Sequence, residues 1–167
     1  MKIILRRDDI VLYSRKISSA FDSLARQNKI HFQFTSNYST SIGWFDKDKV
    51  EKILFNLLSN AFKFTPQSGE VILKVMTEQD PVSNEAKWVT YYIQDNGPGI
   101  PDDKREFLFQ RFVQLDNQKQ SKATGTGLGL SLVHDLVNIL HGEISYDGNE
   151  GKGTTFYYKT ATGKNRF

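Results

Sequence analysis

The feature that most constrains the fold of this 167-residue chain is a long amphipathic pattern between Asp46 and Pro66. Its apolar residues recur at intervals of three and four, at Val50, Ile53, Leu54, Leu57, Leu58 and Ala61. That spacing puts a continuous apolar stripe on one side of an α-helix, which Asp46 or Asp48 can cap and Pro66 ends. Such a stripe must be buried against another layer, so we expect the core to form around this helix.

The same helix carries a second, polar face. Asn56, Asn60 and Lys63 are spaced i, i+4 and i+7, so they share one side of the helix, away from the apolar stripe. The simplest interpretation is that these side chains face solvent, and the triplet alone favours neither this nor a binding role.

The rest of the chain predicts further helices and strands on both sides of this helix. The expected helices cover residues 10–27, after a cap at Asp8 or Asp9, and 128–140, ended by Gly142. The expected strands are 30–36, a short piece near Trp44, 70–78, 87–95, 143–147 and 153–160. We therefore predict an α/β (α+β) two-layer sandwich, in which about three helices cover one face of a mixed, mostly antiparallel sheet of about five strands.

Composition supports one compact domain over residues 1–167 and excludes several classes of protein. The 38% hydrophobic and 25% charged residues are ordinary for a globular domain, and no apolar run approaches the ~20 residues that a membrane span requires. The net charge of +3 comes from interleaved acidic and basic residues rather than a basic stripe, so we expect no nucleic-acid binding and no membrane contact. The absence of cysteine agrees with a cytoplasmic location.

Three glycine-rich stretches stand at the ends of expected elements. "DNGPGIP" from Asp95 follows a strand, "GTGLGL" from Gly125 opens a helix, and "GKGTTF" from Gly151 enters the last strand. Taken singly, the first and third are typical of ordinary turns, whereas the second suits a polyphosphate at a helix N-terminus. Residues 96–126 form a connection long enough to be a functional lid.

Taken together, these stretches resemble the catalytic domains of sensor histidine kinases, in the GHKL ATPase superfamily. The matching segments, in order, are "EKILFNLLSNAFKFTP", "DNGPGI", "LFQRFVQ", "GTGLGLSLV" and "GKGTTF". The resemblance extends from about residue 10 to 160. It implies an ATP-binding domain with Mg²⁺ as cofactor, a long ATP lid, and a two-component system as its context, with a hybrid kinase as one form of the parent protein.

The resemblance also implies roles for individual residues at the adenine end. Asp95 would accept a hydrogen bond from the exocyclic amine of adenine, with Gly97, Gly99 and Ile100 in the loop that follows. Because guanine presents a carbonyl there instead, ATP would be preferred over GTP. Phe64 would pack against the base, and Thr155 would support its recognition.

At the phosphate end, the resemblance makes Asn60 the magnesium ligand, with Asn56 as a helper and Lys63 reaching the phosphates. We therefore expect catalysis to depend on Asn56, Asn60 and Lys63. The residues expected to wrap the triphosphate are Gly125, Thr126, Gly127, Leu128, Gly129 and Leu130. Phe109 and Phe112 would anchor the lid.

Three positions depart from relatives that hydrolyse ATP or that carry a cation in the lid. Position 56 is Asn, where gyrase-like and chaperone-like ATPases have a water-activating Glu, so hydrolysis should be slow. Val113 and Gln114 replace a Tyr-Arg or Tyr-Lys pair, although Lys119 or Lys122 could supply the charge.

The expected partners are therefore ATP, a phosphoacceptor histidine domain of the same or a partner subunit, and a response regulator or receiver domain. His31, His134 and His141 lack a phosphoacceptor context, so that domain is expected outside this chain, and the isolated domain is expected to be a monomer. The parent protein could be anchored in the inner membrane. Two alternatives stay open: an ATPase clamp of the GHKL type, and a degenerate domain that only contacts other proteins.

Overall fold

The computed structural model describes residues 2–99, 129–148 and 152–164. Its main sheet has five strands in the order β2-β4-β5-β7-β6. These strands are β2 (His31–Ser36), β4 (Glu70–Gln79), β5 (Ala86–Asp95), β6 (Glu143–Gly148) and β7 (Thr154–Ala161). Strand β2 pairs in parallel with β4, and the other pairs are antiparallel. The prediction of a mixed, mostly antiparallel sheet is confirmed.

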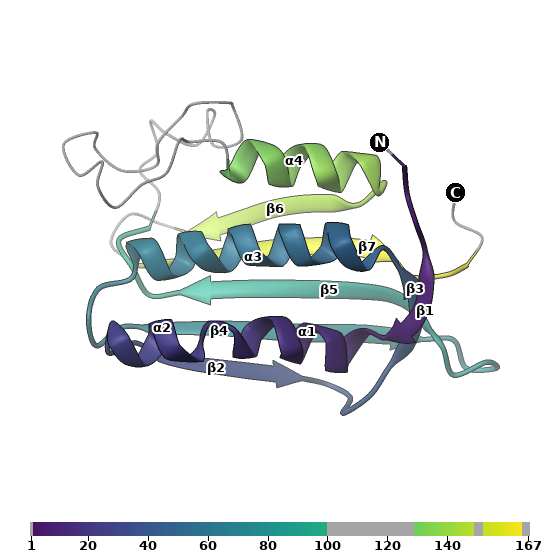
Figure 1. Ribbon diagram of the computed structural model, residues 1–167, viewed down its shortest axis with the longest axis horizontal. Helices are drawn as coiled ribbons and strands as arrows, with labels where there is room; N and C mark the ends of the chain where they lie inside the picture. Colours follow the sequence, from purple (N-terminus) through teal and green to yellow (C-terminus); the bar gives the residue numbers. More distant parts are fainter. Residues whose placement is uncertain (1, 100–128, 149–151, 165–167) are drawn as a thin grey trace.

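The helices lie on one face of this sheet, as Figure 1 shows. They are α1 (Ile10–Ser19), α2 (Asp22–Gln27), α3 (Lys47–Phe64) and α4 (Gly129–Ile139). The central helix is α3, and its predicted apolar stripe is buried, with Ile53, Leu54 and Leu58 fully enclosed. Because burying an aliphatic side chain of this size contributes about 1.5–3 kcal/mol, this stripe is a large part of the folding free energy.

The predicted helix over residues 10–27 is in fact two helices, α1 and α2. The hydroxyls of Ser18 and Ser19 donate to carbonyls one turn earlier, at 2.7 and 2.8 Å, which favours a turn at this point. The break directs Phe21 into the core, where its ring stacks on that of Phe62 with 5.5 Å between centroids. Packing of one aromatic ring therefore outweighs continuation of the helix.

A two-stranded ribbon stands beside the main sheet. It joins β1 (Arg6–Asp9), which was not predicted, to β3 (Ile42–Phe45), the expected short piece near Trp44. Asp9 caps α1 by accepting from the N–H groups of Val11 and Leu12, both at 3.0 Å. The ribbon thereby fixes where α1 begins, and β3 leads directly to the start of α3.

The end of α4 differs in one detail from the prediction that Gly142 ends it. His141 takes the left-handed conformation, with φ of 58°, and the Gly142 N–H closes the helix on the Val137 carbonyl at 2.9 Å. Gly142 is required for a different reason, since a Cβ there would lie 2.8 Å from the Lys159 carbonyl oxygen of β7.

In the described residues, no helix is both long and apolar enough to cross a membrane.

Candidate functional site

The ends of four elements meet at one end of the sheet, on the left in Figure 1: the C-terminus of α3, the end of β5, the start of α4 and the start of β7. Contacts at glycines show how close the approach is. A Cβ at Gly97 would lie 2.8 Å from the Phe64 carbonyl oxygen, and one at Gly129 would lie 3.3 Å from Asn56 Oδ1. The loop after β5 and the start of α4 therefore both pack against α3.

Asp95, the last residue of β5, is the acidic group of this site. It faces the helix layer, because β5 alternates and the neighbouring residues Tyr91 and Ile93 on that face are buried. One carboxylate oxygen accepts from the Gly97 N–H at 2.9 Å, and the Thr154 N–H also donates to the carboxylate.

Burial raises the pKa of Asp95 to about 6, and the two N–H donors only partly oppose this effect. A carboxylate that is partly shielded from water but retains free acceptor capacity is suited to bind a hydrogen-bond donor on a ligand.

The position predicted to support adenine recognition moves by one residue. Thr154, opposite Asp95 in the β5–β7 pairing, is buried on the face that Asp95 occupies. Thr155 is opposite Gln94, and alternation along β7 directs it to the other face of the sheet. The expectation for Thr155 is therefore wrong, and Thr154 has the position to act there.

Glycines around Asp95 are dictated by space and by backbone conformation. Gly153 has a φ of +86°, and a Cβ there would lie 2.2 Å from the Asp95 carbonyl oxygen. Gly99 has a φ of 79°, also in the region that favours glycine. Gly97 is buried between Phe64 and Asp95. Gly153 was not among the predicted site residues, although the "GKGTTF" turn that contains it was one of the matching segments.

The asparagine side of α3 lies beside the start of α4. Asn56 Nδ2 donates to the Lys52 carbonyl at 2.6 Å, which leaves Oδ1 directed toward Gly129. Asn60 is one turn further along, and both side chains are half-buried. Amide oxygens are suitable magnesium ligands when phosphates and waters complete the octahedron, so these residues fit the predicted metal.

The structure is less specific about three other predicted contacts. Lys63 lies in the last turn of α3 and lines a groove of about 430 Å³ together with Lys29, on the α2 side. Phe64, the last residue of α3, is half-buried. Leu130 is 6% exposed and belongs to the core, so its predicted contact with a nucleotide could come only from its backbone. This corrects the expectation for the Leu130 side chain, which lies on the side of α4 that packs into the core.

Several predicted site residues lie outside the described residues: Ile100, Phe109, Phe112, Gly125, Thr126, Gly127 and Leu128. The same holds for most of the predicted lid and for Val113 and Gln114. The predictions for them stay predictions.

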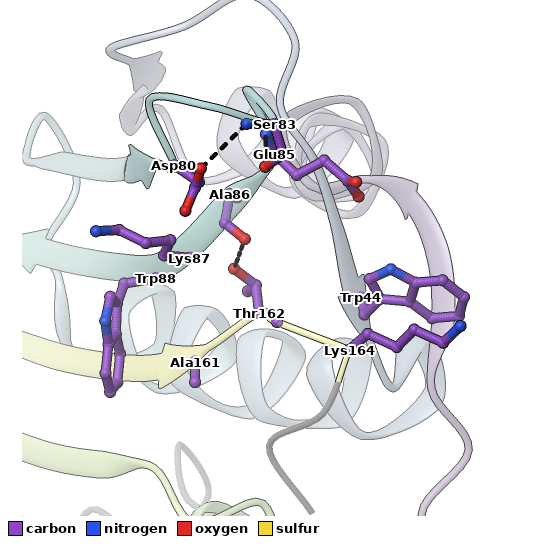
Figure 2. Close-up of a pocket in the computed structure, with 11 residues that line it drawn as sticks. Trp44, Asp80, Ser83, Glu85, Ala86, Lys87, Trp88, Ala161, Thr162 and Lys164 are labelled. Carbon is purple, nitrogen blue, oxygen red and sulfur yellow. Dashed lines mark hydrogen bonds between the residues drawn. The ribbon is translucent and has the colours of Figure 1, made fainter.

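A groove of about 540 Å³ at the opposite end of the sheet does not match the predicted site. Figure 2 shows the residues that line it, among them Trp44, Lys87 and Trp88, with charges of both signs. Its central polar groups already have partners: Asp80 Oδ1 accepts from Ser83 N at 3.0 Å, and Thr162 Oγ1 donates to the Ala86 carbonyl at 2.8 Å. Among the predicted site residues that the structure describes, none lines it.

Comparison with known families identifies a match that spans the segments around Asp95. The profile of the family described as "Histidine kinase-, DNA gyrase B-, and HSP90-like ATPase" matches residues 45–162, which include the described site residues from α3 to β7. The segment before residue 45, with α1, α2 and β2, lies outside this match.

Among curated proteins, the chain is similar to sensor histidine kinase TmoS of Ectopseudomonas mendocina, with 38% identity over 159 residues, 95% of this chain and 16% of that protein. It is also 45% identical over 113 residues to the circadian input-output histidine kinase CikA of Thermosynechococcus vestitus, covering 68% of this chain and 14% of CikA. The chain thus spans about a sixth of the length of these relatives or less.

Solved structures show the same fold. The nucleotide-free catalytic domain of histidine kinase ThkA superposes with a TM-score of 0.79 at 20% identity, covering 96% of this chain and 97% of that chain. Full-length ShkA in complex with AMPPNP gives a TM-score of 0.80 at 27% identity, covering 97% of this chain and 32% of that chain.

Proposed function

This chain belongs to the histidine kinase-, DNA gyrase B- and HSP90-like ATPase family, and we propose that it is the catalytic domain of a sensor histidine kinase, which binds Mg-ATP and donates its γ-phosphoryl group to a histidine on a separate domain. The names of the curated relatives support this assignment. The whole of residues 1–167 acts as this one domain, with residues 96–126 as the ATP lid.

The observation that carries the proposal is the position of Asp95, half-buried at the end of the sheet where the ends of four elements meet. Its carboxylate accepts from the Gly97 and Thr154 N–H groups and still has acceptor capacity for one donor of a ligand. The exocyclic amine of adenine is such a donor, whereas the carbonyl of guanine would face the carboxylate acceptor to acceptor. An unpaired buried polar group is costly, so this site discriminates ATP from GTP.

The polar face of α3 is the phosphate end of the proposed site. Asn60 and Asn56 would hold Mg²⁺ through their amide oxygens, and when bound the ion would neutralise charge on the phosphate oxygens. Gly129 stands beside Asn56 at the N-terminus of α4, where backbone N–H groups and the helix dipole favour phosphate. Lys63 adds a positive charge at the end of α3.

The chemistry of position 56 favours phosphoryl transfer over hydrolysis. An amide cannot accept a proton from water at neutral pH, so Asn56 cannot act as the general base. The γ-phosphoryl group then persists until an external nucleophile attacks it. Our proposal makes that nucleophile a histidine on a domain of the same or a partner subunit, and a response regulator or receiver domain the next acceptor.

The remaining properties that we propose for the domain follow from this role. It acts in the cytoplasm, where ATP is available, and it is monomeric in isolation, because the partner domain is expected to supply dimerisation. Sedimentation that shows a concentration-dependent dimer would contradict the monomer.

The test is calorimetric titration of the domain with ADP and AMPPNP, with and without Mg²⁺, together with GDP and with the Asp95→Asn variant. We expect adenine nucleotides to bind, Mg²⁺ to strengthen AMPPNP binding, and GDP and Asp95→Asn each to lose at least tenfold in affinity. Absence of nucleotide binding under all conditions would overturn the proposal and favour a degenerate domain. Rapid ATP hydrolysis without an acceptor would instead favour an ATPase clamp.

A further inference from the structure

Asn96 follows Asp95 directly and joins the end of β5 to the start of β4. Its side-chain Oδ1 accepts from the Glu70 N–H at 2.7 Å, and its backbone N–H donates to the Glu70 carbonyl at 3.2 Å. Strand pairing ends one residue earlier, at Val71 and Asp95. Asn96 therefore extends the β4–β5 ladder by one position, with its side chain in place of a backbone carbonyl.

Two glycines from other segments are packed against the same residue. A Cβ at Gly69, before β4, would lie 2.9 Å from Asn96 Oδ1, and a Cβ at Gly153, before β7, would lie 3.0 Å from Asn96 Cα. Three connections that are distant in the sequence thus meet at Asn96. A side chain at Gly69 or at Gly153 would displace the close approach of that segment to Asn96.

We propose that Asn96 is a positioning residue for nucleotide binding: its amide oxygen holds the loop after β5 on β4 and so fixes the direction of the Asp95 carboxylate. This inference rests on the proposed function, because it concerns the orientation of the group that binds adenine. Asn96 itself is exposed and is not required to touch the nucleotide.

The geometry explains how Asn96 is coupled to Asp95. Gly97 donates its N–H to Asp95 at 2.9 Å, and Asn96 is the only residue between these two partners. Without the side-chain bond to Glu70, only the longer backbone bond of 3.2 Å holds Asn96 on β4. The backbone of Asn96 is then freer to rotate, so that the Gly97 N–H no longer points at the carboxylate. Loss of the Gly97 N–H bond raises the pKa of Asp95, whereas the water that rotation admits lowers it. Because burial is the larger cause of the raised pKa, we expect the pKa to fall from about 6 toward its ordinary value.

The test compares Asn96→Ala with Asn96→Asp in the same domain. The alanine variant removes the acceptor, whereas aspartate keeps an acceptor oxygen of the same shape and reach. Calorimetry with ADP gives the affinity, and carbon-detected NMR titration gives the pKa of Asp95. Asn96→Gln is added because it keeps the amide but moves the oxygen by one methylene, and thermal unfolding verifies that each variant is folded.

We expect Asn96→Ala and Asn96→Gln to weaken ADP binding about five- to tenfold, the change in equilibrium constant for a net hydrogen bond of ordinary strength. Asn96→Asp should remain within about twofold of the parent, and the Asp95 pKa should fall in the alanine variant. The inference is overturned if the alanine variant binds ADP like the parent or if the pKa of Asp95 is unchanged. If the parent domain does not bind ADP, the proposed function is refuted instead. Failure of the proposed function and failure of the inference about Asn96 therefore give different results.

Discussion

Asp95 and Thr154 lie directly opposite each other in the β5–β7 pairing, and the Thr154 N–H donates to the Asp95 carboxylate. The pair joins two segments that are far apart in the sequence, the end of one strand and the start of the last. Because both residues face the helix layer, a ligand between the sheet and α3 would meet both of them.

Asp95→Asn should stabilise the nucleotide-free domain at neutral pH while it weakens nucleotide binding. The folded-state pKa of about 6 exceeds the unfolded value of 3.8, so between these values the folded state binds more protons than the unfolded state. Stability of the parent therefore falls as pH rises from about 4 to 6, and the ionised carboxylate remains a cost above pH 6. The variant, which has no such group, should gain about 1–3 kcal/mol over the parent between pH 4 and 7.

Urea unfolding of both proteins at several pH values measures this difference. A gap in unfolding free energy that does not widen between pH 4 and 7 would show that Asp95 titrates normally. Asp80→Asn is the control, because Asp80 is a partly exposed carboxylate whose pKa is lowered by N–H groups of its own turn.

Thr154→Val should weaken ADP binding about three- to tenfold, whereas Thr155→Val should leave it nearly unchanged. Valine preserves the volume and the strand propensity of threonine but removes the hydroxyl, whose net hydrogen bond is worth about 1 kcal/mol. The two neighbours face opposite sides of the sheet, so each is the control for the other. Calorimetry with ADP measures both affinities. An equal loss in both variants would contradict the assignment of Thr154 and Thr155 to opposite faces of the sheet.

Asn60→Ala should reduce the gain in AMPPNP affinity that Mg²⁺ provides, with little effect on ADP binding in the presence of a chelator. The reason is that the amide oxygen is the proposed metal ligand and has no role in adenine recognition. Asn138→Ala is a matched control, since Asn138 is an exposed residue on α4. If Asn60→Ala weakened both titrations equally, the residue would be structural rather than a ligand.

Gly153→Ala should destabilise the domain by about 2–4 kcal/mol, because overpacking and left-handed strain act together at this position. The added Cβ would lie 2.2 Å from the Asp95 carbonyl oxygen, and the φ of +86° disfavours any side chain. Gly163→Ala is the control, because a Cβ there meets nothing within 4 Å. Thermal unfolding measures both, and equal melting temperatures would refute the steric argument.

The sequence predicted most elements because their signals are local. The stripe of α3, the alternation in β4 and β5 and the capping aspartate at position 46 each depend on residues only a few positions apart. Strand β1 was missed because its sequence, "RRDD", has no apolar alternation, and it is a strand only through pairing with β3. The break between α1 and α2 was missed because it depends on the stacking of Phe21 against Phe62.

For the site, the sequence by itself, through its resemblance to histidine kinase catalytic domains, predicted the residues that carry the proposed chemistry: Asp95, the asparagines of α3 and the glycine-rich turns. Only the tertiary structure decided which of them meet. It placed Thr154 rather than Thr155 beside Asp95, directed Leu130 into the core, and brought Asn96 against Gly69 and Gly153. The physical reason is that strand register, helix rotation and close backbone approach depend on packing between segments distant in the chain.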